Sequence, residues 1–190
     1  MVRTPRLFVI SGPSGAGKGT VIRRLHQVSP CFALTVSATT RSPRAHEKDG
    51  IDYHFLTNEQ FNRAIEQDAF LEWAHVHSNR YGTLKSEVEK YIHSGQSVIL
   101  EIDPQGAFNV QKAYPTAVLI FIAPPSMDVL RERLIGRKSE TKESLELRLA
   151  DARQEMQLKD RYDAVLINDS LDECAKNLKD LMYVYETKGA

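Results

Sequence analysis

Gly12-Pro13-Ser14-Gly15-Ala16-Gly17-Lys18-Gly19-Thr20 is the stretch from which the fold follows. It comes after an apolar run at 7–10, which predicts a buried strand, and before an amphipathic helix that starts at 21–25. Strand, glycine-rich turn and helix in this order form the context of a phosphate-binding loop, because backbone N–H groups at a helix N-terminus favour anions. Lys18 adds a positive charge for the terminal phosphates. The sequence therefore predicts that residues 12–20 cradle phosphate.

The loop departs from the general pattern at one position. Gly19 follows the lysine, where the pattern has a Ser or Thr that binds Mg²⁺, and the hydroxyl comes one residue later at Thr20. A G-K-G-T ending resembles the nucleoside-monophosphate kinases. It argues against a GTPase switch protein.

The composition is that of an ordinary globular protein of one domain. The chain has 190 residues, of which 42% are hydrophobic and 26% charged, and its formal net charge is zero. This balance gives no reason to expect nucleic acid or a membrane as a partner. The longest apolar run, 117–123, is too short to cross a bilayer, and residues 1–6 lack the apolar region of a signal peptide. We therefore expect a cytoplasmic location.

The two cysteines, Cys31 and Cys174, show neither C-x-x-C nor metal-ligand spacing. We expect both to be reduced core residues.

Strand-like and helix-like segments alternate along the chain, which predicts an α/β fold with a parallel sheet and ligands at the carboxyl ends of its strands. Residues 37–83 contain several short strands and little helix, so they form a small lobe between the second and third core strands. The expected strands are 7–10, 32–36, 51–56, 70–76, 97–103, 117–122 and 164–167, and the expected helices 85–93, 105–113, 126–135, 143–158 and 171–184.

Several separated blocks, taken together and in order, resemble guanylate kinase along nearly the whole chain. The resemblance implies a P-loop parallel sheet core with helices on both faces, made of residues 1–36, 84–135 and 149–190. It also implies a GMP-binding lobe at 37–83 and a helical lid over ATP at 136–148. Besides residues 12–20, the blocks are Ser37-Ala38-Thr39-Thr40-Arg41-Ser42-Pro43-Arg44, Asp49-Gly50-Ile51-Asp52-Tyr53, Phe70-Leu71-Glu72-Trp73, Asn79-Arg80-Tyr81-Gly82-Thr83, Glu101-Ile102-Asp103-Pro104-Gln105-Gly106 and Ile167-Asn168-Asp169.

The resemblance assigns the phosphate of GMP to Arg41 and Arg44, together with Tyr53. Guanidinium groups bind phosphate oxygens bidentately and a phenol adds a neutral donor, so these residue types suit the task. From spacing alone, two solvated loop arginines are an equal alternative.

The resemblance assigns guanine to Glu72, with Ser37 and Thr83 around the base and Tyr81 near the phosphate. One carboxylate can accept both N1–H and the N2 amino group of guanine. Without the resemblance, Glu72 would be interpreted as an outward-facing strand glutamate.

Glu101 and Asp103 are two residues apart, so on one strand they share a face near its carboxyl end. An acid in this position organises Mg²⁺ in many P-loop enzymes. The resemblance also brings this region to guanine, so Asp103 is expected to contact GMP, and Mg²⁺ is expected at Thr20 with either Glu101 or Asp103. Pro104 departs from the family pattern, which usually has a large apolar residue there.

On the ATP side, the resemblance makes Arg137 and Arg148 lid arginines that act in catalysis with Lys18, and it brings Asn168 near the adenine. Cationic clamping suits phosphoryl transfer, which spreads charge over the equatorial oxygens. Lys138 stands where relatives usually have glycine, which puts the mobility of the lid in question. Solvated arginines on a charged hairpin fit the composition equally well.

The leading hypothesis is an enzyme that transfers a phosphoryl group in line from ATP to GMP, giving ADP and GDP, in a Mg²⁺-dependent and reversible step of GMP recycling and GTP supply. dGMP is a further possible substrate. One alternative is a guanylate-kinase-like scaffold module that binds phosphopeptides, although such modules usually have degraded phosphate loops and adjoining domains. Another alternative is a kinase for a different monophosphate, and Glu72 is the residue that discriminates. The sequence does not indicate an oligomeric state.

Overall fold

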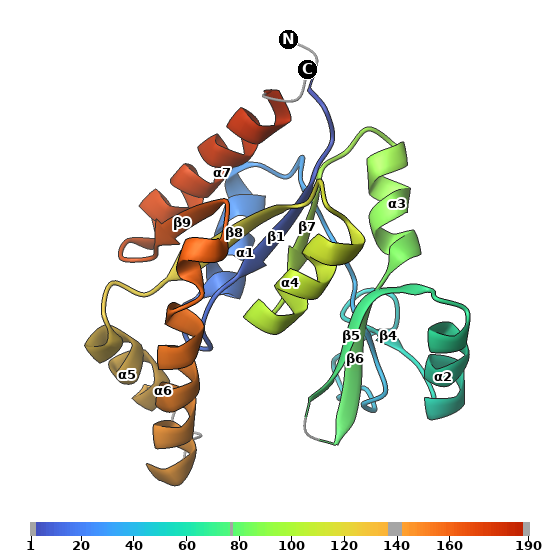
Figure 1. Cartoon of the computed structure of the whole chain (residues 1–190), viewed down its shortest axis with the longest axis horizontal. Coiled ribbons are helices and arrows are strands. Elements are labelled where there is room, and N and C mark those ends of the chain that lie inside the picture. Colours follow the sequence, from blue (N-terminus) through green and yellow to red (C-terminus); the bar gives the residue numbers. More distant parts are fainter. Residues whose placement is uncertain (1–2, 77, 137–141, 188–190) are drawn as a thin grey trace.

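The computed structural model describes residues 3–76, 78–136 and 142–187. Its centre is a five-stranded sheet of order β2-β7-β1-β8-β9, in which every neighbouring pair is parallel (Figure 1). The predicted parallel α/β sheet is therefore confirmed. The strands are β1 (Leu7–Ser11), β2 (Ala33–Leu34), β7 (Val98–Glu101), β8 (Val118–Ala123) and β9 (Ala164–Ile167).

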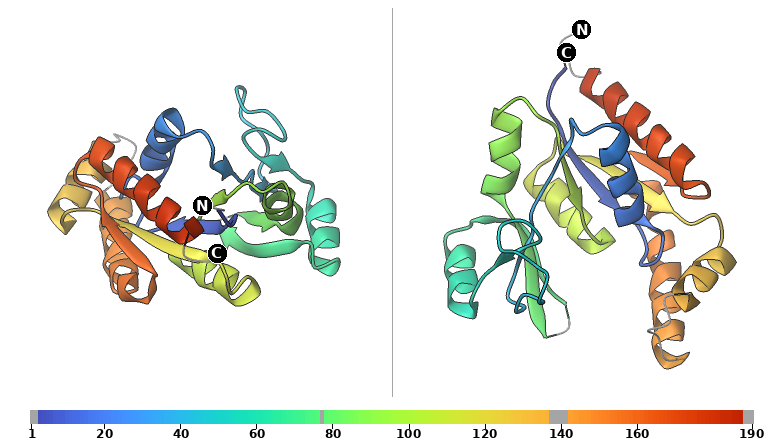
Figure 2. Two further views of the ribbon diagram at one scale, coloured as in Figure 1. Left: turned by 90° about the horizontal axis from the view of Figure 1, so that it is seen from above. Right: turned by 180° about the vertical axis from the view of Figure 1, so that it is seen from behind.

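Helices cover both faces of this sheet, because its central strands are apolar except at their carboxyl ends and alternate side chains point to opposite faces (Figure 2). Phe8 and Ile10 of β1 face α1 (Lys18–Val28) and α7 (Leu171–Thr187). Leu7 and Val9 belong to the opposite face, where α3 (Lys85–His93) and α4 (Pro104–Ala113) pack. Both faces of the sheet are therefore buried.

A second sheet, of order β4-β3-β6-β5, is built entirely from residues between β2 and β7. The antiparallel pair β5 (Phe70–Val76) and β6 (Asn79–Leu84) carries most of it. Gly82 is required in this pair, because a Cβ there would lie 2.8 Å from both the Glu72 carbonyl oxygen and Cβ of Trp73. The remaining strands are β3 (Ala38–Thr39) and β4 (His54–Phe55).

The helix α2 (Asn58–Glu66) packs on this second sheet and begins with a capping box. Thr57 accepts a hydrogen bond from the Gln60 backbone N–H, and the Gln60 side chain accepts one from the Thr57 N–H. Phe61 of α2 stacks on Phe70 of β5 with ring centroids 4.4 Å apart.

Some predicted boundaries were wrong. The strands expected at 32–36 and 51–56 are reduced to two-residue strands, and the strand β3 occupies part of the segment expected to be a loop. Asp49 and Lys48 explain the shortening at 51–56, since they close a turn with Asp52 and Phe55: Lys48 N–H donates to Asp52 Oδ2, and Phe55 N–H donates to Asp49 Oδ1, both at 2.8 Å.

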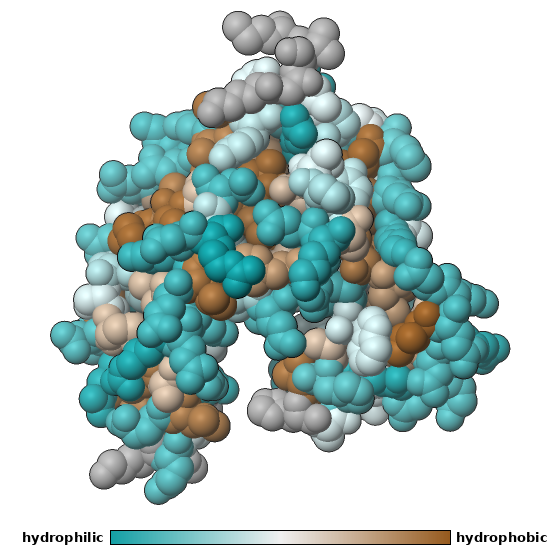
Figure 3. Space-filling model, viewed as in Figure 1, coloured by the Kyte–Doolittle hydropathy of each residue, from teal (hydrophilic) through white to brown (hydrophobic). Residues whose placement is uncertain are grey.

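The helices α5 (Met127–Ile135) and α6 (Lys142–Met156) pack against each other through a cluster of leucines that includes Leu130, Leu134 and Leu149. A short 3₁₀ helix (Lys159–Arg161) then leads to β9. The α5–α6 pair and the second sheet project from the same end of the central sheet, and Figure 3 shows the surface hollowed between them.

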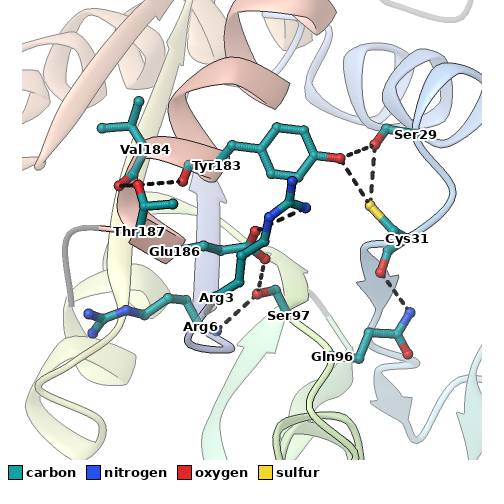
Figure 4. Close-up of polar contacts among 10 residues, drawn as sticks. All are labelled: Arg3, Arg6, Ser29, Cys31, Gln96, Ser97, Tyr183, Val184, Glu186 and Thr187. Atoms are coloured by element: carbon teal, nitrogen blue, oxygen red, sulfur yellow. Dashed lines mark hydrogen bonds and ion pairs between the residues drawn. The ribbon is translucent and has the colours of Figure 1, made fainter. Parts of the chain in front are cut away.

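The segment before β1 and the last turn of α7 meet at the opposite end of the sheet, where polar contacts join them (Figure 4). Glu186 in the last turn of α7 is buried, and the Ser97 hydroxyl donates to its Oε1 at 2.5 Å. The Arg6 backbone N–H donates to the Ser97 hydroxyl, and the Thr4 N–H donates to the Glu186 carbonyl. Arg3 Nη1 lies 3.9 Å from Oε2 of the same carboxylate.

Both cysteines are free thiols, as expected, but only Cys174 is a core residue. Cys31 is exposed, so the prediction that it belongs to the core was wrong. It lies in the turn before β2, where its Sγ is 3.4 Å from the Tyr183 hydroxyl and 3.3 Å from that of Ser29.

Candidate functional site

The phosphate loop requires glycine at two positions where the chain passes very close to its neighbours. A Cβ on Gly12 would lie 2.1 Å from the Ile122 carbonyl oxygen, and one on Gly17 would lie 2.5 Å from Nδ2 of Asn168. Both glycines also have positive φ, at 137° and 90°. A residue with a side chain would therefore disrupt the loop at either position. The loop continues directly into α1, whose first residue is Lys18.

Lys18 bends back over the loop that precedes it. Its Nζ donates to the carbonyl oxygens of Gly12 at 2.6 Å and Pro13 at 3.2 Å. The ammonium group therefore stands at the mouth of the loop, where the terminal phosphates of a nucleotide would lie.

Glu101 ends β7 beside the loop, and its carboxylate fills the space next to Gly19. Burial of this carboxylate raises the pKa of Glu101, while the positive charges of Lys18 and Arg23 lower it. A Cβ on residue 19 would lie 3.2 Å from the nearer oxygen of Glu101, so a side chain there would crowd this carboxylate.

Asp103 does not share a strand face with Glu101, contrary to the expectation, because β7 ends at Glu101. Asp103 instead caps α4, and its Oδ1 accepts a hydrogen bond from the Gly106 N–H at 2.8 Å. Pro104 is then the first residue of the helix, a position that suits proline because no N–H is needed there. The departure at Pro104 is accommodated by this cap.

One cavity of about 440 Å³ lies between Lys18 and the segments that immediately precede β3 and β4. Residues from both parts of the predicted site therefore face the same space. The lining residues are Lys18, Leu34, Thr35, Ser37, Asp52, Tyr53, Glu101, Ile102 and Asp103.

Glu72 is a buried carboxylate on β5, with 8% of its surface exposed, and is not the outward-facing residue of the alternative interpretation. The Thr83 hydroxyl of β6 donates to its Oε1 at 2.8 Å. Burial raises the pKa of Glu72 to about 7, and the negative charge of Asp103 adds to the rise, against the hydrogen bond from Thr83. This carboxyl group consequently titrates near neutral pH.

Arg41, Tyr53 and Tyr81 form one cluster on the second sheet. The guanidinium carbon of Arg41 lies 5.3 Å from the ring centroid of Tyr53, and the two tyrosine rings are 6.0 Å apart. Arg44 is exposed beside them, and no described hydrogen bond involves its side chain. The structure thus brings together three of the four residues expected around the GMP phosphate.

The sequence interpretation missed Glu47, the partner of Arg41. Its two oxygens accept from Nη1 and Nη2 of Arg41, each at 2.9 Å, and Oε2 also accepts the Arg44 backbone N–H at 2.8 Å. These bonds hold the pKa of Glu47 well below its usual range, at about 2. Nη1 also donates to the Ser42 carbonyl, and Arg41 forms a further side-chain hydrogen bond with Tyr81. The guanidinium is therefore held from several sides, and few of its five donors are left for another acceptor. The spacing R-x-x-R-x-x-E over 41–47 is the sequence feature that could have indicated this pairing of Glu47 with Arg41.

Asn168 is buried directly after β9 and holds the phosphate loop. Its Nδ2 donates to the Ala16 carbonyl at 2.7 Å. Arg133 of α5, which no sequence pattern indicated, donates to the Asn168 carbonyl at 2.8 Å. Both line a cavity of about 270 Å³ on this side of the loop, together with Gly15, Gly17, Thr20, Asp169 and Leu171.

Of the two expected lid arginines, Arg137 lies outside the described residues, as do 138–141 of the segment 136–148 expected to form the lid. Arg148 lies on α6, seven residues before Glu155 and therefore on nearly the same face of the helix. Glu155 was also missed. Its carboxylate accepts the Ser14 N–H of the phosphate loop and feels the charge of Lys18, although burial still raises its pKa. This face of α6 is therefore turned toward the loop.

The parallel sheet, the glycine loop with its lysine and the acidic strand end define a P-loop phosphotransferase. The guanylate kinase family model matches residues 4–185. Guanylate kinases of Clostridium perfringens and a Polaromonas species are 48% and 44% identical over 93% and 96% of this chain, and the matches cover 82% and 88% of those proteins. The chain belongs to the guanylate kinase family and has guanylate kinase function.

Comparison with solved structures agrees. A guanylate kinase from Anaplasma phagocytophilum superposes with a TM-score of 0.77 at 32% identity, covering 97% of this chain and 88% of the other. A shikimate kinase from Bacteroides thetaiotaomicron, at 12% identity and a TM-score of 0.51, shares the fold alone. Among the described residues, no helix has the length and apolar character needed to cross a membrane.

Proposed function

We propose that the chain transfers the terminal phosphoryl group of ATP directly to GMP, reversibly, in the space between the phosphate loop and the second sheet. ATP binds with its phosphates on residues 12–20, and residues 37–83 bind GMP. The observation that carries the proposal is the buried Glu72 carboxylate of the second sheet, which the Thr83 hydroxyl holds and which lies within electrostatic reach of Asp103.

The guanine base is recognised by its two adjacent donors. Ionised Glu72 accepts N1–H and the N2 amino group, while Ser37, Thr83 and Asp103 surround the base. Burial of this carboxylate increases the discrimination between bases, because a base that lacks either donor leaves the carboxylate desolvated and without a full set of hydrogen bonds.

The phosphate of GMP binds the Arg41 cluster. Glu47 fixes the guanidinium of Arg41 by its terminal nitrogens, so its positive charge is already positioned when the phosphate arrives. Tyr53 and Tyr81 add neutral donors beside it, and Arg44 adds a second positive charge from the exposed side of the loop.

Lys18 holds the terminal phosphates of ATP, and Asn168 keeps the loop in the shape that receives them. Arg137 and Arg148 close on the transferring phosphoryl group and stabilise the charge that develops on its oxygens. The segment 136–148 acts as the lid, and α6 carries Arg148 on the face that Glu155 turns toward the loop.

Mg²⁺ enters with ATP as part of the substrate. Mg²⁺ prefers oxygen ligands, usually one or two carboxylates together with waters and substrate phosphates. Glu101 and Thr20 fit as its protein ligands or as partners of its waters, because both line the cavity beside Lys18. Asp103 is less suited, since one of its oxygens caps α4. When bound there with ATP, Mg²⁺ would supply positive charge against the charge that develops during phosphoryl transfer.

These substrates support a cytoplasmic role in purine nucleotide metabolism, supplying GDP for GTP.

The test is a coupled assay of ADP release with GMP, dGMP, AMP, CMP and UMP as acceptors. We expect GMP to exceed AMP by roughly 10⁴-fold in kcat/KM, because a site built to bond a substrate group rejects analogues that lack it. Equal turnover of AMP, or turnover of none of them, would overturn the proposal.

A further inference from the structure

Arg23 is an exposed residue of α1, one turn beyond the phosphate loop, and the function described above gives it no role. Its Nη2 donates to the Thr20 hydroxyl at 3.2 Å. A Cβ built on Gly19 would lie 3.2 and 3.3 Å from the two oxygens of Glu101 and 3.5 Å from Nη1 of Arg23. Guanidinium, hydroxyl and carboxylate therefore gather around one point of the loop.

The same three side chains line a cavity of about 280 Å³ together with the loop itself. Burial disfavours the ionised form of Glu101, and the charge of Lys18, followed by that of Arg23, stabilises it. A hydroxyl and a carboxylate are oxygen ligands of the kind that Mg²⁺ prefers. The guanidinium of Arg23 is thus a positive charge of the protein itself, and it lies beside Thr20 and Glu101, the two side chains best suited to bind Mg²⁺.

We propose that Arg23 is the internal counter-cation of Thr20 and Glu101, and that it sets how strongly the binding of ATP is linked to the binding of Mg²⁺. The proposal rests on the site assigned to ATP above. Two cations compete for the same oxygens, so Arg23 opposes capture of the free metal by the empty protein. It also offsets the charge of Glu101, which would otherwise repel ATP that arrives without metal. Arg23 acts through Glu101 and Thr20, and is a positioning residue.

The neighbouring arginine provides a matched control. Arg24 has the same charge on the same helix, but its Nε donates to Asp172 Oδ1 at 2.5 Å and its Nη1 to Gln27, away from the loop. Arg23→Gln and Arg24→Gln therefore remove equal charge from adjacent residues, and only Arg23→Gln removes it from Thr20 and Glu101.

The experiment measures equilibrium binding of ATP by calorimetry without GMP, once with saturating Mg²⁺ and once with EDTA. The quantity of interest is the ratio of the ATP affinity measured in Mg²⁺ to the ATP affinity measured in EDTA, which is the factor by which Mg²⁺ strengthens ATP binding. Arg23→Gln should raise this factor about three- to tenfold, mainly by weakening ATP binding in EDTA, which is the size expected for one exposed charge. Arg24→Gln and the charge-conserving Arg23→Lys should leave it close to the wild-type value. Unfolding midpoints show that each variant is folded.

An unchanged factor in Arg23→Gln would refute the proposal. Equal weakening of ATP binding in both conditions would also refute it, since Arg23 would then be a direct phosphate ligand. Lys18→Ala is measured in parallel: wild-type ATP affinity in that variant would overturn the proposed ATP site itself, independently of Arg23.

Discussion

Replacing Glu72 with glutamine should stabilise the protein above neutral pH while impairing its function. The folded protein keeps the proton of Glu72 up to about pH 7, whereas the unfolded chain releases it near the ordinary value of 4.5. Between these values the folded state binds more protons, so stability falls as the pH rises and stays reduced above pH 7. A rise in pKa of this size corresponds to about 3 kcal/mol.

The amide of Glu72→Gln carries no charge and can still accept the hydrogen bond from Thr83. At pH 8 we therefore expect a variant more stable than wild type by up to about 3 kcal/mol, or roughly 5–10 °C in Tm for a chain of this length. The advantage should disappear as the pH approaches 4.5. Thermal unfolding between pH 5 and 8 measures it, with Glu66→Gln, an exposed glutamate at the end of α2, as the control.

The same variant should lose about 2–4 kcal/mol in kcat/KM for GMP, because an amide cannot accept both guanine donors with a full charge. The ratio of GMP to AMP activity should narrow with it. In wild type, kcat/KM for GMP should rise with pH through about 7 as Glu72 ionises, and the variant should lack this rise. A variant that is no more stable at pH 8, with an unchanged GMP to AMP ratio, would refute the reasoning.

Three further predictions concern other parts of the molecule. Lys18→Ala should abolish transfer without moving the unfolding midpoint, because it removes a cation at the mouth of the loop; activity within a few-fold of wild type would contradict the assignment. Arg41→Ala should mainly raise KM for GMP, whose phosphate is present in the ground state, whereas Arg148→Ala should lower kcat by on the order of 10³ or more. Steady-state kinetics with both substrates separates the two, and the reverse pattern would exchange their roles. Ser97→Ala should cost roughly 1–3 kcal/mol in urea unfolding, because it removes the hydroxyl donor from buried Glu186 and leaves activity intact; an unchanged midpoint would mean that water replaces the hydroxyl.

The core of the fold could be predicted because its signals are local and strong. The strands at 70–76 and 164–167 and the helix at 85–93 have the predicted bounds, since apolar periodicity and a closing Ser-Gly mark them. The strand expected at 51–56 was too long, because the side chains of Asp49 and Asp52 bond to backbone N–H groups nearby and turn the chain instead.

The site was less accessible to sequence reasoning, because its contacts join distant segments. The capping role of Asp103 depends on where β7 ends, and no periodicity marks that point. The contact of Arg133 with Asn168 spans 35 residues, and only the packing of α5 beside the loop creates it. The burial of Glu72 likewise follows from the pairing of β5 with β6, whereas the strand alone favoured an exposed side chain.

The most direct test of the central claim follows the phosphoryl group itself. The wild-type protein is incubated with Mg²⁺, ATP labelled at the γ-phosphate and an excess of GMP, and the products are separated by chromatography. Direct transfer predicts that the label leaves ATP only when GMP is present and appears in GDP. Label in inorganic phosphate or on the protein would contradict a site built to join ATP to GMP, as would labelled ADP formed at a similar rate when AMP replaces GMP.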